Sequence, residues 1–381
     1  MRVLVVGPVV VPVVVPVVVL VALASAVAAL TVPAAADVEP GHVERGHVEP
    51  GHVEPGQRPR VKPLVWGRDL ADPSVVEVND NYLAVGTGTA ITRFRAGGAR
   101  GPFKELSTPL TAYPSWVLPG ELWAPDLAQV ADGTWRLYFT APAAGLPPGG
   151  RCIGVATAAT AAGPFTPYGD APLVCPPRVG WAPASDELLD REGDLPASGV
   201  IDASLFTERD GRQYLLYKTQ GKPSTIRMVL LQPDGVVVSP GRRSKRLLRT
   251  ADTVENPTLV RRDDYYVLFA SEGEYSNCDY RTTYRRSRKK WSWPTGSTNL
   301  LGPVLTGLCG PGGADVVAPR RGGPLRMFFH GWTCYLTAQP CPRGFRRGRD
   351  GSLLPSRAMY GLVLDFDESD RPLIADYLAP R

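Results

Sequence analysis

The feature that most constrains the fold is a hairpin unit that occurs five times. In each unit a short apolar run leads into a turn rich in Asp, Asn or Gly and then into an aromatic-rich run, which is the pattern of a β-hairpin. The units span 72–87, 124–141, 201–218, 254–271 and 312–332. Matching positions in successive units are 52 to 79 residues apart. Strand-only repeats of this length are typical of propeller blades. The sequence therefore predicts an all-β fold, a five-bladed β-propeller.

Composition agrees with a turn-rich β protein. Gly (40) and Pro (39) are abundant, whereas His (4) and Met (4) are scarce. The formal net charge is only +5, which does not demand a nucleic-acid partner. Two basic clusters, 284–291 and 344–351, are interpreted as solvated loops. We expect no nucleic-acid partner and a monomer.

The N-terminal region has the features of an export signal. Arg2 is the only charge before an apolar run over 3–36 that ends in three alanines, a small-residue cleavage pattern. We expect a signal peptide over 1–36 and a secreted, extracellular protein. The run is also long enough to span a bilayer, so membrane anchoring through this segment is the alternative. A five-residue repeat rich in Pro, Gly and His then predicts an extended linker over 37–61, followed by the propeller over 62–381.

The six cysteines fit an oxidising compartment, and none forms a C-x-x-C pair. Local spacing favours pairing between neighbours, namely Cys152 with Cys175, Cys278 with Cys309, and Cys334 with Cys341. Three of the four histidines lie in the linker, and they are interpreted as spacers. A zinc site built from several histidines is therefore disfavoured.

Acidic residues stand where the hairpins begin. In a propeller the innermost strands run along the axis, so their first residues meet at one end of the central channel. Asp72, Asp202 and Glu255 hold this place in three units, and Asp126 and Asp315 lie close to it in the other two. The alternative is that these residues only cap turns at strand ends.

At these residues the chain resembles glycoside hydrolase family 43, the five-bladed propellers that include arabinanases, arabinofuranosidases and xylosidases. The resemblance covers roughly 64–378. The matching elements, in chain order, are Asp72-Pro73, WAPD (123–126), VIDASLF (200–206), Glu255-Asn256-Pro257, FFHGW (328–332) and SRAMYGLVLDFD (356–367).

The resemblance implies a secreted, inverting glycoside hydrolase that acts on arabinosyl or xylosyl linkages of plant-type oligo- or polysaccharides. Motif matching makes Asp72 the general base and Glu255 the general acid, about 6.5–9.5 Å apart. Asp202 would raise the pKa of Glu255 and orient it, since a nearby carboxylate makes a second ionisation harder.

Substrate-binding residues are expected around these three carboxyl groups. The candidates are Trp123, Asp126, Tyr275, His330 and Arg357. Trp123 could instead pack between blades, His330 could be a core histidine, and Arg357 could point outward.

Two positions depart from the family pattern. Many arabinanase relatives carry G-P-G-H before the fifth blade, and that histidine helps to hold a central ion. Here Gly313 stands in its place, so we expect no calcium site of that type, no metal ligands and no required cofactor. Another ion, or water, could still fill the channel. Ala203 replaces a frequent proline, which should not alter the chemistry.

Other functions stay open from the residues alone. A propeller that binds glycans without cleaving them would keep the aromatic residues but needs no acid. A retaining enzyme of the invertase kind would need its two carboxyl groups only about 5–5.5 Å apart. A structural surface protein is supported only by the linker. The residues do not identify the sugar or exo against endo action, and the insert 179–198 is the expected wall of the pocket.

Overall fold

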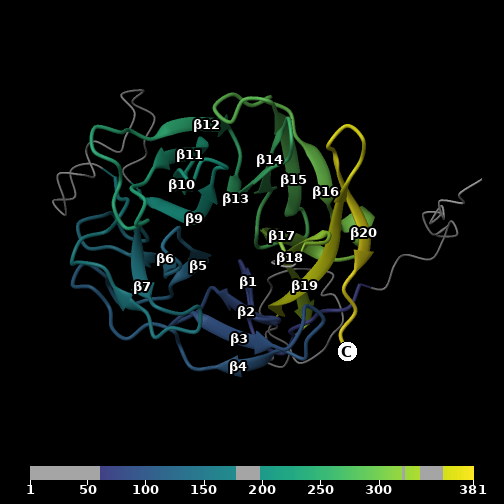
Figure 1. Ribbon diagram of the computed structural model, residues 1–381, viewed down its shortest axis with the longest axis horizontal. Coiled ribbons are helices and arrows are strands. Elements are labelled where there is room, and N and C mark those ends of the chain that lie inside the picture. Colours follow the sequence, from purple (N-terminus) through teal and green to yellow (C-terminus); the bar gives the residue numbers. More distant parts are fainter. Residues whose placement is uncertain (1–60, 177–197, 320–321, 335–354) are drawn as a thin grey trace, which may run out of the picture. The chain divides into compact units, whose positions relative to one another are not determined.

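The computed structural model describes residues 61–176, 198–319, 322–334 and 355–381. Five four-stranded antiparallel sheets are arranged around a central axis, with β1, β5, β9, β13 and β17 innermost (Figure 1). The predicted five-bladed β-propeller is confirmed. Three predicted segments lie outside the described residues: the signal or anchor segment, the linker and the insert 179–198. Only the last residue of the linker, 61, and the last residue of the insert, 198, are described.

Each sheet is a meander of four consecutive strands. The first contains β1 (Ser74–Val78), β2 (Asn81–Gly86), β3 (Thr92–Ala96) and β4 (Lys104–Leu106). The second contains β5 (Trp123–Gln129), β6 (Trp135–Pro142), β7 (Arg151–Ala158) and β8 (Thr166–Pro167). The third contains β9 (Val200–Thr207), β10 (Gln213–Thr219), β11 (Ser224–Leu230) and β12 (Lys245–Thr250). The fourth contains β13 (Val254–Arg261), β14 (Tyr266–Glu272), β15 (Arg281–Ser287) and β16 (Thr298–Leu301). The fifth contains β17 (Cys309–Val317), β18 (Leu325–Cys334), β19 (Pro355–Phe366) and β20 (Pro372–Tyr377).

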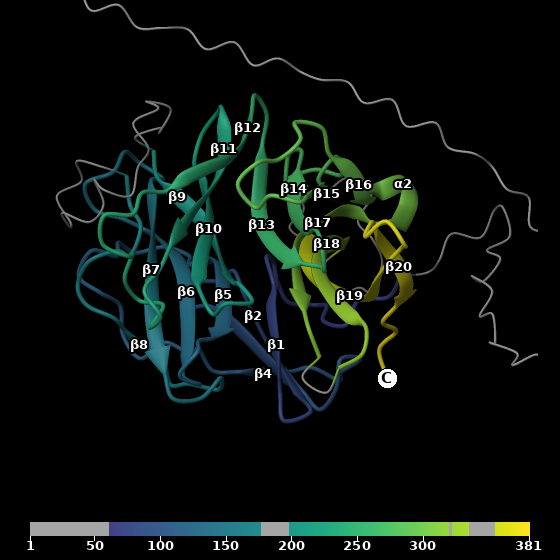
Figure 2. The ribbon, with the colours of Figure 1, turned by 45° about the horizontal axis from the view of Figure 1, so that its top comes forward.

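One short helix, α2 (Pro303–Thr306), connects the fourth sheet to the fifth and lies at the side of the ring (Figure 2). It begins at a proline and ends before Gly307, whose positive φ of 72° suits a helix C-terminus. Within the part of the chain that the structure describes, no helix has the length and apolar character needed to cross a bilayer.

The core consists of five apolar clusters, each between two neighbouring sheets. Successive side chains on a strand point to opposite faces, and here both faces are covered. On β10, for example, Leu215 and Tyr217 pack toward the second sheet, whereas Leu216 packs toward the fourth. The contact between Tyr82 and Phe328, with ring centroids 6.1 Å apart, belongs to the cluster that closes the ring between the first and fifth sheets.

The segment before β1 also closes the ring. The backbone N–H of Leu64 donates to the carbonyl of Met359 at 2.7 Å, and Leu70 donates to the carbonyl of Arg357 at 2.8 Å. Both acceptors belong to β19, so the beginning of the folded region is joined directly to the last blade.

A repeated backbone feature marks the channel end of every inner strand. In each blade one residue has a positive φ, between 38° and 59°, and is followed by Pro or Ala and then by Ser, Asp or Thr. These residues are Asp72, Ala124, Asp202, Asn256 and Gly313. The expected register is therefore corrected: Asp72 and Asp202 are equivalent, whereas Glu255 precedes the equivalent position by one residue, and Asp126 and Asp315 follow it by two.

The disulfide predictions are confirmed where they can be followed. Cys152 is bonded to Cys175, and Cys278 to Cys309. Cys334 is disulfide-bonded as well, and its predicted partner Cys341 lies outside the described residues.

Candidate active site

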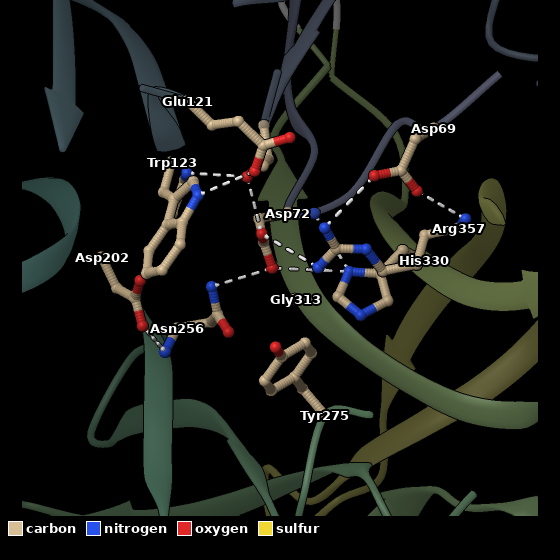
Figure 3. Close-up of polar contacts among 12 residues, drawn as sticks. Asp69, Asp72, Glu121, Trp123, Asp202, Asn256, Tyr275, Gly313, His330 and Arg357 are labelled. Carbon is tan, nitrogen blue, oxygen red and sulfur yellow. Dashed lines mark hydrogen bonds and ion pairs between the residues drawn. The ribbon is translucent and has the colours of Figure 1, made fainter. Parts of the chain in front are cut away.

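A cavity of about 310 Å³ opens at the channel end where the inner strands begin. Its lining includes all three predicted catalytic residues and three of the predicted substrate-binding residues. These are Asp72, Asp202, Glu255, Trp123, Tyr275 and Arg357. Figure 3 shows most of them facing one another across the cavity, which we call the catalytic cavity.

Asp72 is surrounded by donors that stabilise a carboxylate. Thr87 donates its hydroxyl to Oδ2 at 2.8 Å, and Asn256 donates Nδ2 to Oδ1 at 3.3 Å. Nη1 of Arg357 lies 3.6 Å from Oδ2 (Figure 3). Arg357 therefore points inward and not to solvent. It is also held by Asp69, whose Oδ2 is 3.3 Å from Nη2.

Glu255 has a cation and a phenol as neighbours. Nζ of Lys218 lies 2.6 Å from Oε2, and the hydroxyl of Tyr280 lies 2.7 Å from Oε1. Burial lowers the pKa of Lys218, but the carboxyl groups of Glu255 and Asp202 more than offset this and raise it above its usual value. Lys218 thus stays charged beside Glu255. Burial, followed by the charge of Glu255, raises the pKa of Tyr280, so its hydroxyl keeps its proton.

Asp202 is the most buried of the three carboxyl groups, with 6% of its surface exposed. Its Oδ2 accepts a hydrogen bond from the backbone N–H of Asn256 at 3.0 Å, and its own N–H donates to Oγ1 of Thr140 at 3.2 Å. Burial and then the nearby Glu255 raise the pKa of Asp202 to about 8.

Asn256 connects the three carboxyl groups. Its backbone N–H bonds Asp202, its Nδ2 bonds Asp72, and its Oδ1 lies 2.7 Å from the hydroxyl of Tyr280, which also contacts Glu255. With a φ of 46°, Asn256 directs its backbone N–H toward Asp202 and its side chain toward Asp72. A shift of this residue would therefore disturb all three at once.

A pH-dependent stability test follows from the burial of Asp202. In the folded protein Asp202 keeps its proton up to about pH 8, whereas the unfolded chain loses it near 3.8, so folding becomes less favourable as pH rises between these values. Asp202→Asn removes this titration and retains an oxygen for Asn256. Relative to wild type, we expect the variant to gain at least about 1 kcal/mol in free energy of unfolding between pH 4 and pH 8.5.

Denaturant unfolding at the two pH values measures this difference. Asp263→Asn, on a side chain that is 89% exposed, controls for the loss of one carboxylate. An Asp202→Asn variant that loses stability relative to wild type as pH rises would contradict the assignment.

Trp123 forms one wall of the catalytic cavity, and one of its faces is already covered. The guanidinium carbon of Arg151 lies 3.3 Å from the ring centroid, and Nε1 donates to Glu121 at 3.2 Å. The ring is thus fixed in orientation. Tyr275 is half exposed on the rim, and its carbonyl accepts a hydrogen bond from Trp332 at 2.8 Å.

Two predicted substrate-binding residues are corrected. His330 is fully buried and does not line the catalytic cavity. Its Nδ1 accepts the backbone N–H of Asp72 at 3.0 Å, and its ring stacks on Tyr280 with centroids 5.7 Å apart. Burial and then the charge of Arg357 lower its pKa well below the usual range, so the imidazole is neutral. It supports Asp72 from behind.

Asp126 lies deeper in the channel, beside a cavity of only about 30 Å³. Its oxygens accept from the hydroxyl of Ser74 at 3.3 Å and the backbone of Leu205 at 2.8 Å, so it joins the first three blades. Burial and then the charge of Asp315 raise its pKa to about 7, and burial raises the pKa of Asp315 to about 6. Both aspartates bind backbone amides of neighbouring blades.

The residues do not fit the calcium site of arabinanase relatives. A Cβ on Gly313 would lie 2.6 Å from Nδ1 of His330 and 2.9 Å from Oδ1 of Asp72, so a histidine has no room there. Among the described residues, no group of three or more His, Cys, Asp or Glu side chains is arranged as a metal site. Whether another ion occupies the channel stays a prediction.

Sequence reasoning missed Lys218, Tyr280 and the side chain of Asn256. Lys218 stands near the end of an otherwise uncharged run, where a lysine side chain ordinarily contacts solvent. A usable signal existed for Asn256, since it stands directly before a proline as Asp72 does, and this aligns Asn256 with Asp72.

The fold and this cavity define a five-bladed propeller with three carboxyl groups gathered at one end of its channel. The sequence model of Glycosyl hydrolases family 43 matches residues 62–340, so the chain belongs to this family. The predicted family is therefore confirmed.

Individual relatives are distant. The extracellular endo-alpha-(1->5)-L-arabinanase of Thermotoga petrophila is 24% identical over 229 residues, which are 56% of this chain and 47% of that protein. The chain thus spans about half the length of the curated relative it matches.

Solved structures show the same fold. An endo-1,4-beta-xylanase of Bacteroides thetaiotaomicron has a TM-score of 0.61 and 22% identity, covering 84% of this chain and 99% of its own. An alpha-L-arabinanase of Cellvibrio cellulosa, complexed with arabinohexaose, has a TM-score of 0.58 and 18% identity, covering 80% and 95%.

Proposed function

We propose that the protein is an inverting glycoside hydrolase acting on arabinosyl or xylosyl linkages of oligo- or polysaccharides. The observation that carries the proposal is the convergence of Asp72, Asp202 and Glu255 on one cavity, each with different polar neighbours. Glycosidic cleavage needs one carboxylate to activate water and one carboxylic acid to protonate the leaving oxygen.

Asp72 is the proposed general base. Arg357, Thr87 and Asn256 all direct donors or positive charge at its carboxylate, which fixes the direction of the carboxylate. An ionised, oriented carboxylate can accept the proton of a water molecule as that water attacks the anomeric carbon.

Glu255 is the proposed general acid, and Asp202 and Lys218 are the groups that tune it. The carboxyl group of Asp202 disfavours a second negative charge in the buried site, whereas Lys218 favours it. The ionisation of Glu255 thus depends on the positive charge of Lys218 and on which of the two neighbouring carboxyl groups, Asp202 or Glu255, holds the proton.

The sugar is proposed from the relatives. The names of the similar proteins specify arabinanase and xylanase activity, and arabinohexaose is bound to one of them. Trp123 and Tyr275 offer aromatic surface for a pentose ring in the catalytic cavity. Secretion is proposed as well, because the matched relative is described as extracellular.

The function is tested on nitrophenyl arabinofuranoside, nitrophenyl xyloside, arabinan and xylan. Proton NMR of the first product formed distinguishes inversion of the anomeric centre from retention. Hydrolysis with inversion is the expected result. Retention would contradict the base assignment of Asp72, and no hydrolysis of any substrate would contradict the function.

Lys218→Met tests the tuning of the acid. Removing the positive charge 2.6 Å from Glu255 takes away a partner that favours the charged carboxylate, so the basic limb of the pH profile of kcat/KM should move to higher pH. Lys222→Met, on an exposed lysine at the same end of the blade, is the matched control. A basic limb that stays in place, or moves to lower pH, would remove Lys218 from the mechanism.

A further inference from the structure

A further cavity, of about 340 Å³, lies between the third and fourth blades, which are neighbours in the ring (Figure 1). We call it the rear cavity. Its walls include Tyr214 of β10, Leu230 of β11 and Trp291 of the β15–β16 connection. Its cationic lining residues are Arg212, Arg242, Arg243, Lys245 and Lys290.

The rear cavity is separate from the catalytic cavity. Tyr214 pairs with Leu230 at one end of the β10–β11 ladder, whereas Lys218, which lines the catalytic cavity, follows Tyr214 by four residues. Four strand residues span roughly 13 Å, so the two cavities lie toward opposite ends of the blade. The rear cavity and the catalytic cavity also share no lining residue, so they are two separate sites.

The rear cavity carries an excess of positive charge. Lys290 is matched by Glu208 at 2.9 Å, and Arg212 by Asp210 at 2.6 Å. The other three cations form no ion pair among the residues that the structure describes. Like charges held in one concave site raise the local potential and attract an anion.

The positive charges adjoin an aromatic surface. The rings of Trp291 and Tyr214 meet edge to face with centroids 5.6 Å apart. Nζ of Lys245 lies 5.5 Å, and Nζ of Lys290 5.9 Å, from the centroid of Trp291. A ligand with both a carboxylate and an apolar C–H face would meet both kinds of partner at once.

We propose that the rear cavity binds an anionic saccharide, a segment of polysaccharide that contains uronic acid. Each uronic acid residue offers a carboxylate, which the planar guanidinium groups of Arg242 and Arg243 match geometrically. The volume lies within the range of about 300–1,000 Å³ that is usual for ligand pockets. The choice of a saccharide rests on the proposed function. The site would hold an acidic polymer on one face of the propeller while the catalytic cavity works on the other.

The test measures binding alone, without hydrolysis. Calorimetry of the full chain with trigalacturonate should show binding that weakens as sodium chloride rises, because exposed charges are screened. Arg242→Ser/Arg243→Ser should weaken binding at least about tenfold, since each lost charge-assisted hydrogen bond contributes substantially. Lys62→Ser/Lys104→Ser removes two exposed cations elsewhere and should leave binding unchanged. Hydrolysis of nitrophenyl glycosides should be unchanged in both double variants.

Several results would overturn the proposal. One is equal binding of trigalacturonate by wild type and Arg242→Ser/Arg243→Ser. Another is equal binding of a neutral xylotriose, which would indicate stacking without charge recognition. Tighter binding of inorganic polyphosphate, or of phosphatidylglycerol vesicles, would assign the rear cavity to a different anion. If the chain hydrolysed no glycoside yet bound trigalacturonate as described, the proposed function would fail while the rear site stood.

Discussion

Asp72→Asn is expected to abolish hydrolysis of every substrate, with kcat reduced by about 10²–10⁴-fold or more. The amide cannot accept the proton of the attacking water, so the rate should stay low even for a substrate with a good leaving group. The substitution should leave the backbone conformation unchanged, because Asp72 has a φ of 47° and Asn tolerates the left-handed region as well as Asp does. Steady-state rates on nitrophenyl arabinofuranoside and arabinan measure the effect, alongside a thermal unfolding curve.

Asp69→Asn is the matched control for this variant. Asp69 contacts the same arginine as Asp72, with 3.3 Å between Oδ2 and Nη2 of Arg357, yet it does not line the catalytic cavity. We expect its rates to fall far less. If Asp72→Asn kept more than a tenth of the wild-type kcat, Asp72 would be excluded as the base.

Glu255→Gln is expected to separate substrates by leaving group. Without a proton donor, hydrolysis of arabinan or xylan should fall by about 10²–10⁴-fold. An activated aryl glycoside, whose leaving oxygen needs little protonation, should lose less than about tenfold. The amide keeps an oxygen for Lys218 or a donor for Tyr280, so both contacts of Glu255 can be partly retained. Paired rates on dinitrophenyl and natural substrates measure the difference.

Glu274→Gln supplies the comparison at a carboxylate that lines the same cavity but is exposed. We expect Glu274→Gln to change the hydrolysis rate of neither substrate by more than a few-fold. An equal loss on both substrate kinds in Glu255→Gln would show that Glu255 positions the sugar and does not protonate it.

The blades could be predicted because their signal is local. An alternating pattern and a turn of Asp, Asn or Gly specify a hairpin without reference to the rest of the chain, and five hairpins suffice to predict the ring. Asp72 and Asp202 could be located for the same reason, since each stands at the head of its own repeat. The confirmed disulfides were also local, as each joins cysteines no more than 31 residues apart.

The rest of the site depends on offsets that the repeat pattern does not resolve. A shift of one residue along a strand changes the face on which a side chain lies, and a shift of two moves the side chain further along the same face. Asp126 therefore binds the backbone of the next blade, whereas Trp123 faces the catalytic cavity. Lys218 lies on the second strand of the third blade, and Tyr280 directly precedes the third strand of the fourth blade. Packing of the third blade against the fourth brings Lys218 to Glu255, and pairing of strands within the fourth blade brings Tyr280 there. Nothing in the sequence beside Lys218 or Tyr280 predicts these contacts.

The positive φ at the head of each inner strand restricts which amino acids are stable at that position. A residue with a Cβ is less stable in this conformation by roughly 1–2 kcal/mol, and Asp and Asn bear it better than most others. Of the five positions, four hold Asp, Asn or Gly, and Ala124 is the exception. The backbone of the ring thus offers a short list of residues, and that list includes one carboxylic acid. Glutamate falls outside it, and the glutamate of the site stands one residue earlier, before Asn256, where the conformation no longer restricts the choice. The backbone at the heads of the inner strands therefore favours aspartate over glutamate at these places in the cavity.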